Sequence, residues 1–440
     1  MQLQKIASKN IDQTGLMCYH KSNHKECARD KPVEHTATYL FDKVLMLETM
    51  DKYFEIKIHR CRWIFSFHSM AKKGEEIMKK IVTSESVNIG HPDKTCDVIA
   101  DAFLDAALSQ DPNAQMAVEC AIKNNKLFVY GEATTTANVD YRKIATEVLS
   151  EIGYTQPFDI VLELSQQSPD INQAVVKQKL CANDQGIVFG YATNETKELM
   201  PLPILVAHKI MQRYEEYRKT TSVFFADAKC QVSVCYEDGK PSHFTTILVS
   251  ASHAKEFDLV SAKIMQNVIF PTLEEYKQFV DTDDLKLIVN PSGKFTIWGS
   301  HGDSGCVGRK IVVDTYGGVA KVGGGCFSSK NATKVDRSGA YYARYVAKNL
   351  VANGLCDKCE IEVSYGIGLS EPLSLAIETF GTEKVSLDKI YEVVKDNFNF
   401  SPDNIIKELD LLRPIYKQTA CYGHFGREQF PWERVIELKI

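Results

Sequence analysis

Apolar and polar residues begin to recur regularly at Lys79, and from there the pattern predicts a succession of strands and helices. Residues 80–87 predict a strand and a turn. The stretch after His91 has helical periodicity, with one apolar face and one acidic face. The apolar face carries Ile99, Phe103, Ala106 and Ala107, and the acidic face carries Asp97, Asp101 and Asp105.

Similar rounds of strands and helices follow along the chain. Two β-rich runs flank Asn124-Asn125 and two more flank Asp238-Gly239, and each pair is typical of a hairpin. Further helices are expected at 140–153, 258–270, 337–354 and 386–398, and further strands at 310–316, 359–368 and 372–381. We therefore predict an α+β protein of three small domains, each of which lays its helices on one face of a sheet.

The composition is that of a folded protein without a broad charged surface. Its 440 residues are 44% hydrophobic and carry a net charge of −5, so we expect no nucleic-acid partner and no membrane partner. No apolar run approaches the length of a membrane span or of a signal-peptide core. The 13 cysteines, an odd number, favour reduced thiols and a cytoplasmic location over a disulfide framework.

Residues 1–77 lack the periodicity of the rest of the chain. We expect them to be an N-terminal extension that is disordered or not native. The expected domains after it are N-terminal (78–178), central (181–297) and C-terminal (298–440).

Two groups of cysteines suggest metal sites, but their spacing argues against them. Cys356 and Cys359 form a single CxxC pair with no second pair elsewhere. The segment from Cys18 to Cys27 holds two cysteines and two histidines, at a spacing that matches no standard zinc finger. We therefore expect neither group to bind zinc.

His91, Pro92, Asp93 and Lys94 stand together where the first helix is predicted to begin. Proline and aspartate suit the first turn of any helix, so a plain start signal explains half of the motif. Cations are disfavoured there unless an anion binds at the helix N-terminus. The alternative is therefore an anion site in which Asp93 also holds Mg²⁺.

Residues 299–349 combine many glycines with a row of lysines and arginines. Glycine-rich turns let backbone N–H groups approach phosphates, and the cations supply charge for several phosphate oxygens. A flexible surface loop with solvated lysines is the alternative. A polyphosphate site explains the pattern better, although neither a Walker A motif nor GxGxxG is present.

Together these stretches resemble the S-adenosylmethionine synthetase (methionine adenosyltransferase) family. The resemblance runs from Lys79 to the C-terminus through motifs such as "TSESVNIGHPDK", "GEATTTANVDY", "NDQGIVFGYATNET", "GDSGCVGRKIVVDTYGG" and "YGHFGREQFPWE". It implies three intertwined βαββαβ-like domains with pseudo-threefold symmetry. It also implies transfer of the adenosyl group of ATP to methionine sulfur, followed by hydrolysis of the triphosphate to pyrophosphate and phosphate. The implied cofactors are Mg²⁺, two per site, and K⁺, and the implied assembly is a homodimer with shared active sites, pairing into a homotetramer.

The resemblance also assigns roles to residues, motif by motif. The catalytic set is His91, Lys229, Arg309, Lys310 and Lys330. ATP is bound by these five and by Lys94, Asp227, Phe295, Thr296, Asp303 and Cys326. Methionine is bound by Glu132, Gln173, Asp303 and Lys334. The metal ligands are Asp93 for Mg²⁺ and Glu119 for K⁺, and Asp184 and Asp336 are further acids that line the site.

The chain departs from the family pattern in three loops. It has "FADAK" where relatives usually have "RPDAK", "FSSKN" for "FSGKD" and "CANDQG" for "GAGDQG", which brings in Asn183 and Ser329 in place of glycines. We also expect residues 171–183 to form a mobile gate over the site. Two other functions remain open at this point: an ATP or tripolyphosphate hydrolase, and a non-catalytic regulatory subunit.

Overall fold

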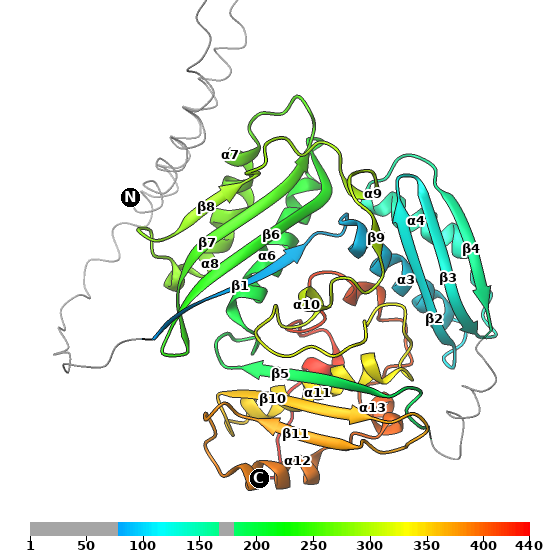
Figure 1. The fold of residues 1–440 in the computed structure, drawn as a ribbon, viewed down its shortest axis with the longest axis vertical. Coiled ribbons are helices and arrows are strands. Elements are labelled where there is room, and N and C mark those ends of the chain that lie inside the picture. Colours follow the sequence, from blue (N-terminus) through cyan, green and yellow to red (C-terminus); the bar gives the residue numbers. More distant parts are fainter. Residues whose placement is uncertain (1–77, 167–179) are drawn as a thin grey trace, which may run out of the picture. The chain divides into compact units, whose positions relative to one another are not determined.

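The computed structural model describes residues 78–166 and 180–440, and it contains three sheets (Figure 1). The first has the strand order β1-β6-β7-β8, formed by Lys79–Val87, Phe224–Glu237, Lys240–His253 and Lys286–Val289. The second has the order β4-β3-β2-β9, formed by Asp159–Ser165, Lys126–Thr134, Gln115–Lys123 and Gly305–Cys306. The third has the order β11-β10-β5, formed by Ser374–Glu378, Lys358–Tyr365 and Gly186–Thr193.

The three sheets exchange strands with one another. β1 is the first strand of the described chain, yet it pairs antiparallel with β6 rather than with β2. β5 pairs antiparallel with β10, and the short β9 pairs with β2. Each sheet therefore contains a strand from a distant part of the chain, and this exchange makes the three α+β layers one interwoven unit.

Helices cover these sheets. α3 (Pro92–Leu108) packs on β2 and on α4 (Tyr141–Ile152), whereas α6 (Leu202–Arg218) packs on β1 and β6. α11 (Val335–Ala352) packs on β5 and β10. The other helices and helical turns are α7 (Val260–Ile264), η2 (Met265–Ile269), α8 (Phe270–Glu275), η3 (Lys277–Phe279), α9 (Gly299–Gly302), α10 (Ile311–Asp314), α12 (Leu387–Asn397), α13 (Pro402–Glu408), η4 (Lys417–Thr419) and η5 (Pro431–Glu433).

The predicted turns are confirmed by their backbone geometry. Glu237 pairs with Lys240 across Asp238 and Gly239, whose φ angles are 49° and 78°. Positive φ at both central residues is the mark of the tight turn that suits the twist of a hairpin. α4 ends at Gly153 with φ of 117°, a conformation that glycine adopts without strain.

One prediction about local structure was wrong, and one helix is less regular than expected. Residues 310–316 do not form a strand, because α10 makes a helical turn there in which Asp314 N donates to Lys310 O over 2.9 Å. Tertiary contacts override the β-branched composition, since Val313 and Asp314 are buried. The helix expected at 258–270 is present from Val260, but it is irregular, because α7 passes into the π-helical turn η2 before α8.

The acidic face of α3 is buried. Asp97 and Asp101 are fully buried, and Asp105 accepts the backbone N–H groups of Tyr416 and Lys417 over 2.9 and 2.8 Å. The row of aspartates therefore joins α3 to segments more than two hundred residues further along the chain. Among the described residues, no helix is long and apolar enough to cross a membrane.

Candidate active site

The N-terminus of α3 organises the first cluster of predicted site residues. His91 is the N-cap, and its Nδ1 accepts the backbone N–H of Asp93 over 3.2 Å. Pro92 occupies the first helical position, where its missing N–H costs nothing. Gly305 lies against this turn so closely that a Cβ there would meet the carbonyl carbon of Pro92 at 2.2 Å. The close approach brings β9 and the segment after it onto the helix N-terminus.

Asp93 is the centre of a charged cluster. Its Oδ2 accepts Lys310 Nζ over 2.6 Å, and its Oδ1 accepts the backbone N–H of Cys306 over 3.0 Å. Arg309 Nε lies 3.3 Å from Oδ1. Burial alone would raise the pKa of Asp93, but these partners outweigh it and lower the pKa. Asp93 is therefore an anion that draws Arg309 and Lys310 to the start of α3.

His91 is neutral in this environment. Burial lowers its pKa to about 3, and the positive charges of Lys229 and Lys310 add to the effect, while Asp93 and Asp303 oppose it only in part. Because Nδ1 accepts a hydrogen bond, the proton of the neutral ring is on Nε2. The ring thus carries one N–H donor among several cations, with Lys229 on β6 opposite Val87.

The structure does not bring Lys94 into this cluster. Lys94 is fully buried, and its Nζ donates to Asp97 Oδ2 over 2.7 Å and to Asp314. Burial opposes the charge, but the two carboxylates outweigh it and raise the pKa of Lys94. The predicted phosphate contact of Lys94 therefore does not fit this conformation, in which the side chain joins α3 to α10.

Asp227 connects β6 to the segment that carries Phe295 and Thr296. Its Oδ2 accepts the backbone N–H of Gly299 over 2.9 Å, and burial raises its pKa to about 6. Phe295 is half-buried, as is Thr296, and its backbone exchanges hydrogen bonds with His253.

An aromatic stack beside Asp227 was missed by the sequence analysis. Trp298 stacks on Tyr154 at 4.8 Å and on Phe225 at 5.7 Å between ring centroids. These residues lie far apart in the sequence, so no local pattern could have revealed the stack. Phe225 is also where the chain departs from "RPDAK", so an aromatic ring occupies the position of the usual arginine.

A second cluster contains Lys334 and Glu132, two of the residues predicted to hold methionine. Lys334 is the N-cap of α11, and burial together with Lys330 lowers its pKa, while Asp184, Glu132 and Asp336 oppose this effect. Lys330 Nζ donates to Asp336 Oδ2 over 2.5 Å. A Cβ at Gly325 would meet Asp336 Cγ at 2.1 Å, so only glycine permits this carboxylate beside the loop.

Glu119 and Cys326 lie near the second cluster. Glu119 Oε2 accepts the hydroxyl of Tyr130 over 3.2 Å. Burial raises the pKa of Cys326 to about 11, with Lys330 opposing and Glu119 adding to the shift. Cys326 also packs on Gly308, next to Arg309. The thiol is therefore a packing group between the two clusters rather than a reactive one.

Asn183 is a further polar contact of the second cluster. With its side-chain amide oriented to satisfy both atoms, it accepts Lys334 Nζ over 2.8 Å and donates to Thr333 O over 3.0 Å. Asn183 replaces a glycine of the usual family pattern, so this contact comes with the substitution. Gln173 and most of the expected gate at 171–183 lie outside the described residues.

Comparisons with known proteins decide the family. Models of the N-terminal, central and C-terminal domains of S-adenosylmethionine synthetase match residues 79–180, 179–295 and 297–434. The chain belongs to the S-adenosylmethionine synthetase family. It is 48% identical to the S-adenosylmethionine synthase of Mesoplasma florum over 375 residues, which are 82% of this chain and 99% of the relative. It is 45% identical to that of Staphylococcus epidermidis over 390 residues, 82% of this chain and 97% of the relative.

The three α+β layers are the architecture of the S-adenosylmethionine synthetase family, so the predicted fold class is confirmed. The chain is therefore an enzyme of the methionine adenosyltransferase class, and membership supports formation of S-adenosylmethionine from methionine and ATP. The first cluster brings His91, Asp93, Arg309 and Lys310 together, and the second brings Lys330, Lys334 and Asp336 together.

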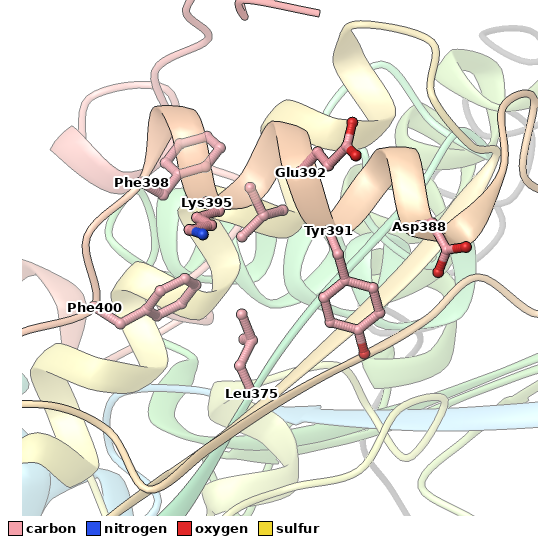
Figure 2. A pocket seen from close by; sticks show the side chains of 8 residues that line it. Leu375, Asp388, Tyr391, Glu392, Lys395, Phe398 and Phe400 are labelled. Atoms are coloured by element: carbon pink, nitrogen blue, oxygen red, sulfur yellow. The ribbon is translucent and has the colours of Figure 1, made fainter.

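A cavity of about 480 Å³ lies apart from these clusters, between β11 and α12 (Figure 2). Its wall is largely apolar, with Tyr391, Phe398 and Phe400 around it and Asp388 and Lys395 at the helix. None of its lining residues is a predicted site residue of the S-adenosylmethionine synthetase chemistry.

The acids of the two clusters fit the metal ions that the S-adenosylmethionine synthetase family implies. Mg²⁺ prefers carboxylate oxygens and usually takes only one or two from protein, the rest from phosphate and water. Asp93 and Asp303 offer such oxygens beside the cations of the first cluster. Glu119 offers a hard oxygen donor of the kind that K⁺ takes.

Proposed function

We propose that this chain forms S-adenosylmethionine from ATP and L-methionine and releases pyrophosphate and phosphate. The observation that carries the proposal is the first cluster, in which neutral His91 stands among Lys229, Arg309 and Lys310. Attack of the methionine sulfur on C5′ breaks the bond from C5′ to the triphosphate oxygen. The sulfur becomes a sulfonium cation, and the bonding electrons leave with the triphosphate.

The sulfur of a thioether is already a competent nucleophile, so the reaction needs no activating base. Its difficulty lies in the leaving group, whose bridging oxygen gains negative charge as the bond breaks. Cations held in place before the reaction stabilise such charge more in the transition state than in the ground state. Arg309, Lys310 and Lys330 are proposed for this role, with Lys229 next to them.

His91 is proposed to donate its Nε2 proton as a hydrogen bond to the leaving oxygen. Its low pKa supports this role, because a neutral ring with Nδ1 occupied presents a fixed N–H donor. The hydrogen bond strengthens as the oxygen gains charge, and no proton needs to be transferred. Asp227, Phe295, Thr296 and Cys326 are proposed to contact the rest of the nucleotide.

The second cluster is proposed to hold methionine. The α-carboxylate of methionine would pair with Lys334 and its ammonium group with Glu132 and Gln173, and Asp303 is proposed as a further methionine contact. Asp184 and Asp336 keep the surroundings acidic, which suits a cationic sulfonium product. Lys330 would leave Asp336 for phosphate oxygens when the triphosphate binds.

Mg²⁺ and K⁺ are proposed cofactors. Asp93 and Asp303 would hold Mg²⁺, and Glu119 would hold K⁺. Bound Mg²⁺ supplies positive charge to the triphosphate oxygens, in addition to that of the lysines and Arg309. In the protein alone, Arg309 and Lys310 pair with Asp93. When the triphosphate and Mg²⁺ bind, Arg309 and Lys310 would pair with phosphate oxygens instead, and Asp93 would bind the metal ion.

The proposed assembly is a homodimer with shared active sites, two of which pair into a tetramer in the cytoplasm. The outward sides of the sheets support an assembly, because they expose apolar side chains such as Ile81, Phe128, Val161 and Ile187. The proposed domains keep the boundaries predicted above, with 1–77 as an extension.

Mass spectrometry of the purified chain with ATP, methionine, Mg²⁺ and K⁺ tests the proposal. We expect the sulfonium product, with phosphate and pyrophosphate released only when methionine is present. Phosphate release that does not depend on methionine would favour an ATP hydrolase instead. A chain that makes no product and releases no phosphate would favour a regulatory subunit.

A further inference from the structure

A group of potential metal ligands lies at the turn end of the β6–β7 hairpin. Cys235, Glu237 and His243 each offer one ligand atom, and these atoms all lie within 4.8 Å of one another. Cys235 follows Lys229 by six residues on β6, which places it roughly 20 Å from the first cluster along the strand. We infer that these three side chains form a Zn²⁺ site, separate from the proposed Mg²⁺ and K⁺ sites.

The strand register brings the three residues together. Cys235 and His243 are directly opposite each other on β6 and β7, and Glu237 follows Cys235 by two residues, so it lies on the same face. The register shifts on both sides of the Cys235–His243 pair, between Ser233 and Val234 and between Cys235 and Tyr236. Bulges of this kind re-aim side chains and often accompany functional sites.

The chemistry of the donors favours Zn²⁺. Sulfur, imidazole nitrogen and carboxylate oxygen are its usual ligands, and three protein ligands leave a fourth position for water. Ser242 Oγ lies 3.0 Å from His243 Nδ1, and metal-bound histidines usually have one ring nitrogen held by such a neighbour. The thiol of Cys235, 5% exposed, would release its proton to solvent when the metal–sulfur bond forms.

Lys79 is expected to affect the Zn²⁺ affinity of the site. Its Nζ lies 2.9 Å from Glu237 Oε1, and this partner lowers the pKa of Glu237. A carboxylate has a second oxygen, so Lys79 and a metal ion can share it, but the two cations repel each other. Zn²⁺ would join β6 to β7 at a point where Lys79 already joins β1 to β6, and it would stabilise this end of the sheet.

Titration of the full-length, chelator-washed protein with Co²⁺ and Zn²⁺ tests the inference. Co²⁺ bound to a thiolate gives a charge-transfer absorption, and Zn²⁺ should displace it with one equivalent. We expect Cys235→Ser and His243→Asn each to weaken binding by at least about tenfold. Matched controls, Cys356→Ser with Cys359→Ser and Cys18→Ser with Cys27→Ser, should leave the absorption unchanged.

Lys79→Met provides a test in the opposite direction, because removing the competing charge should strengthen Zn²⁺ binding by about two- to fivefold. Near-ultraviolet circular dichroism shows whether each variant keeps the fold. No thiolate absorption in the wild-type protein would overturn the inference, as would absorption that survives Cys235→Ser or disappears in a control. Unchanged affinity in Lys79→Met would also overturn it, even if Cys235→Ser failed to fold.

Discussion

Ser329 combines a buried side chain with a backbone conformation that suits glycine. Its φ is 78°, and the residue is 1% exposed. Within the part of the chain that the structure describes, its hydroxyl has no hydrogen-bond partner. Its backbone N–H donates to Asp101 Oδ1 over 3.0 Å, which holds the strained residue in place. The loop that carries Lys330 is therefore under local strain that its sequence does not relieve.

Ser329→Gly should stabilise the protein because it removes both the unpaired hydroxyl and the left-handed conformation of a residue with a Cβ. Ser329→Ala removes only the hydroxyl and is the matched control. We expect the glycine variant to exceed the alanine variant by about 1 kcal/mol in the free energy of unfolding. Urea denaturation at one protein concentration measures the difference. An alanine variant as stable as the glycine variant would show that the backbone is not strained.

The low pKa of His91 leads to a prediction about pH. In the folded protein the pKa of His91 is about 3, below the ordinary histidine value near 6.5. Between these two pH values His91 stays unprotonated in the folded protein, whereas it takes up a proton in the unfolded chain. The stability contributed by His91 is therefore complete above about pH 6.5 and is lost as the pH falls towards 3. The histidine ring signal in NMR should not titrate between about pH 5 and 8. His91→Asn assigns the signal, and a midpoint near 6.5 would contradict the neutral donor.

At the scale of the element, α3 connects sequence and site most directly. Its start signal, its apolar face and the charged motif at its N-terminus were all predictable, because they depend on neighbours along one helix. The burial of its acidic face was not predictable, because the partners of Asp97, Asp101 and Asp105 lie between Gly308 and Lys417. Lys94 was assigned to phosphate from its motif, although its carboxylate partner Asp314 is 220 residues away.

Asp101 and Arg337 form a bidentate connection of this kind. Both are fully buried, and two hydrogen bonds of 2.8 and 2.7 Å join the guanidinium to the carboxylate. Asp101→Asn leaves the cation buried without its counter-charge, so we expect it to reduce the free energy of unfolding by about 3–5 kcal/mol. Asp388→Asn, at an exposed first-turn aspartate of α12, should change it by no more than about 0.5 kcal/mol. Similar losses in both variants would mean that the buried pair is not special.

At the scale of the whole molecule, the interweaving of the sheets was beyond the reach of sequence patterns. Local alternation predicted the hairpins at Asn124 and Asp238, because each depends on adjacent strands. It could not show that β1 joins β6 or that β5 joins β10, since such pairings are decided by tertiary packing. The aromatic stack of Trp298 on Tyr154 and Phe225 has the same origin. The resemblance to a family implied that the domains are intertwined, but it gave neither these pairings nor the stack.

The proposed sharing of active sites between subunits gives a prediction for the assembly. Lys310→Ala disables the first cluster and Lys334→Ala disables the second, so each variant alone should be inactive. If each site takes its two clusters from different subunits, a dimer of the two variants has one intact site and one doubly defective site. A random mixture of exchanged subunits should then recover about a quarter of the wild-type activity, and purified heterodimers about half. Lys310→Ala mixed with Arg309→Ala, both in the first cluster, should recover none. No recovery in the first mixture, with subunit exchange verified by two affinity tags, would place both clusters of each site in one chain.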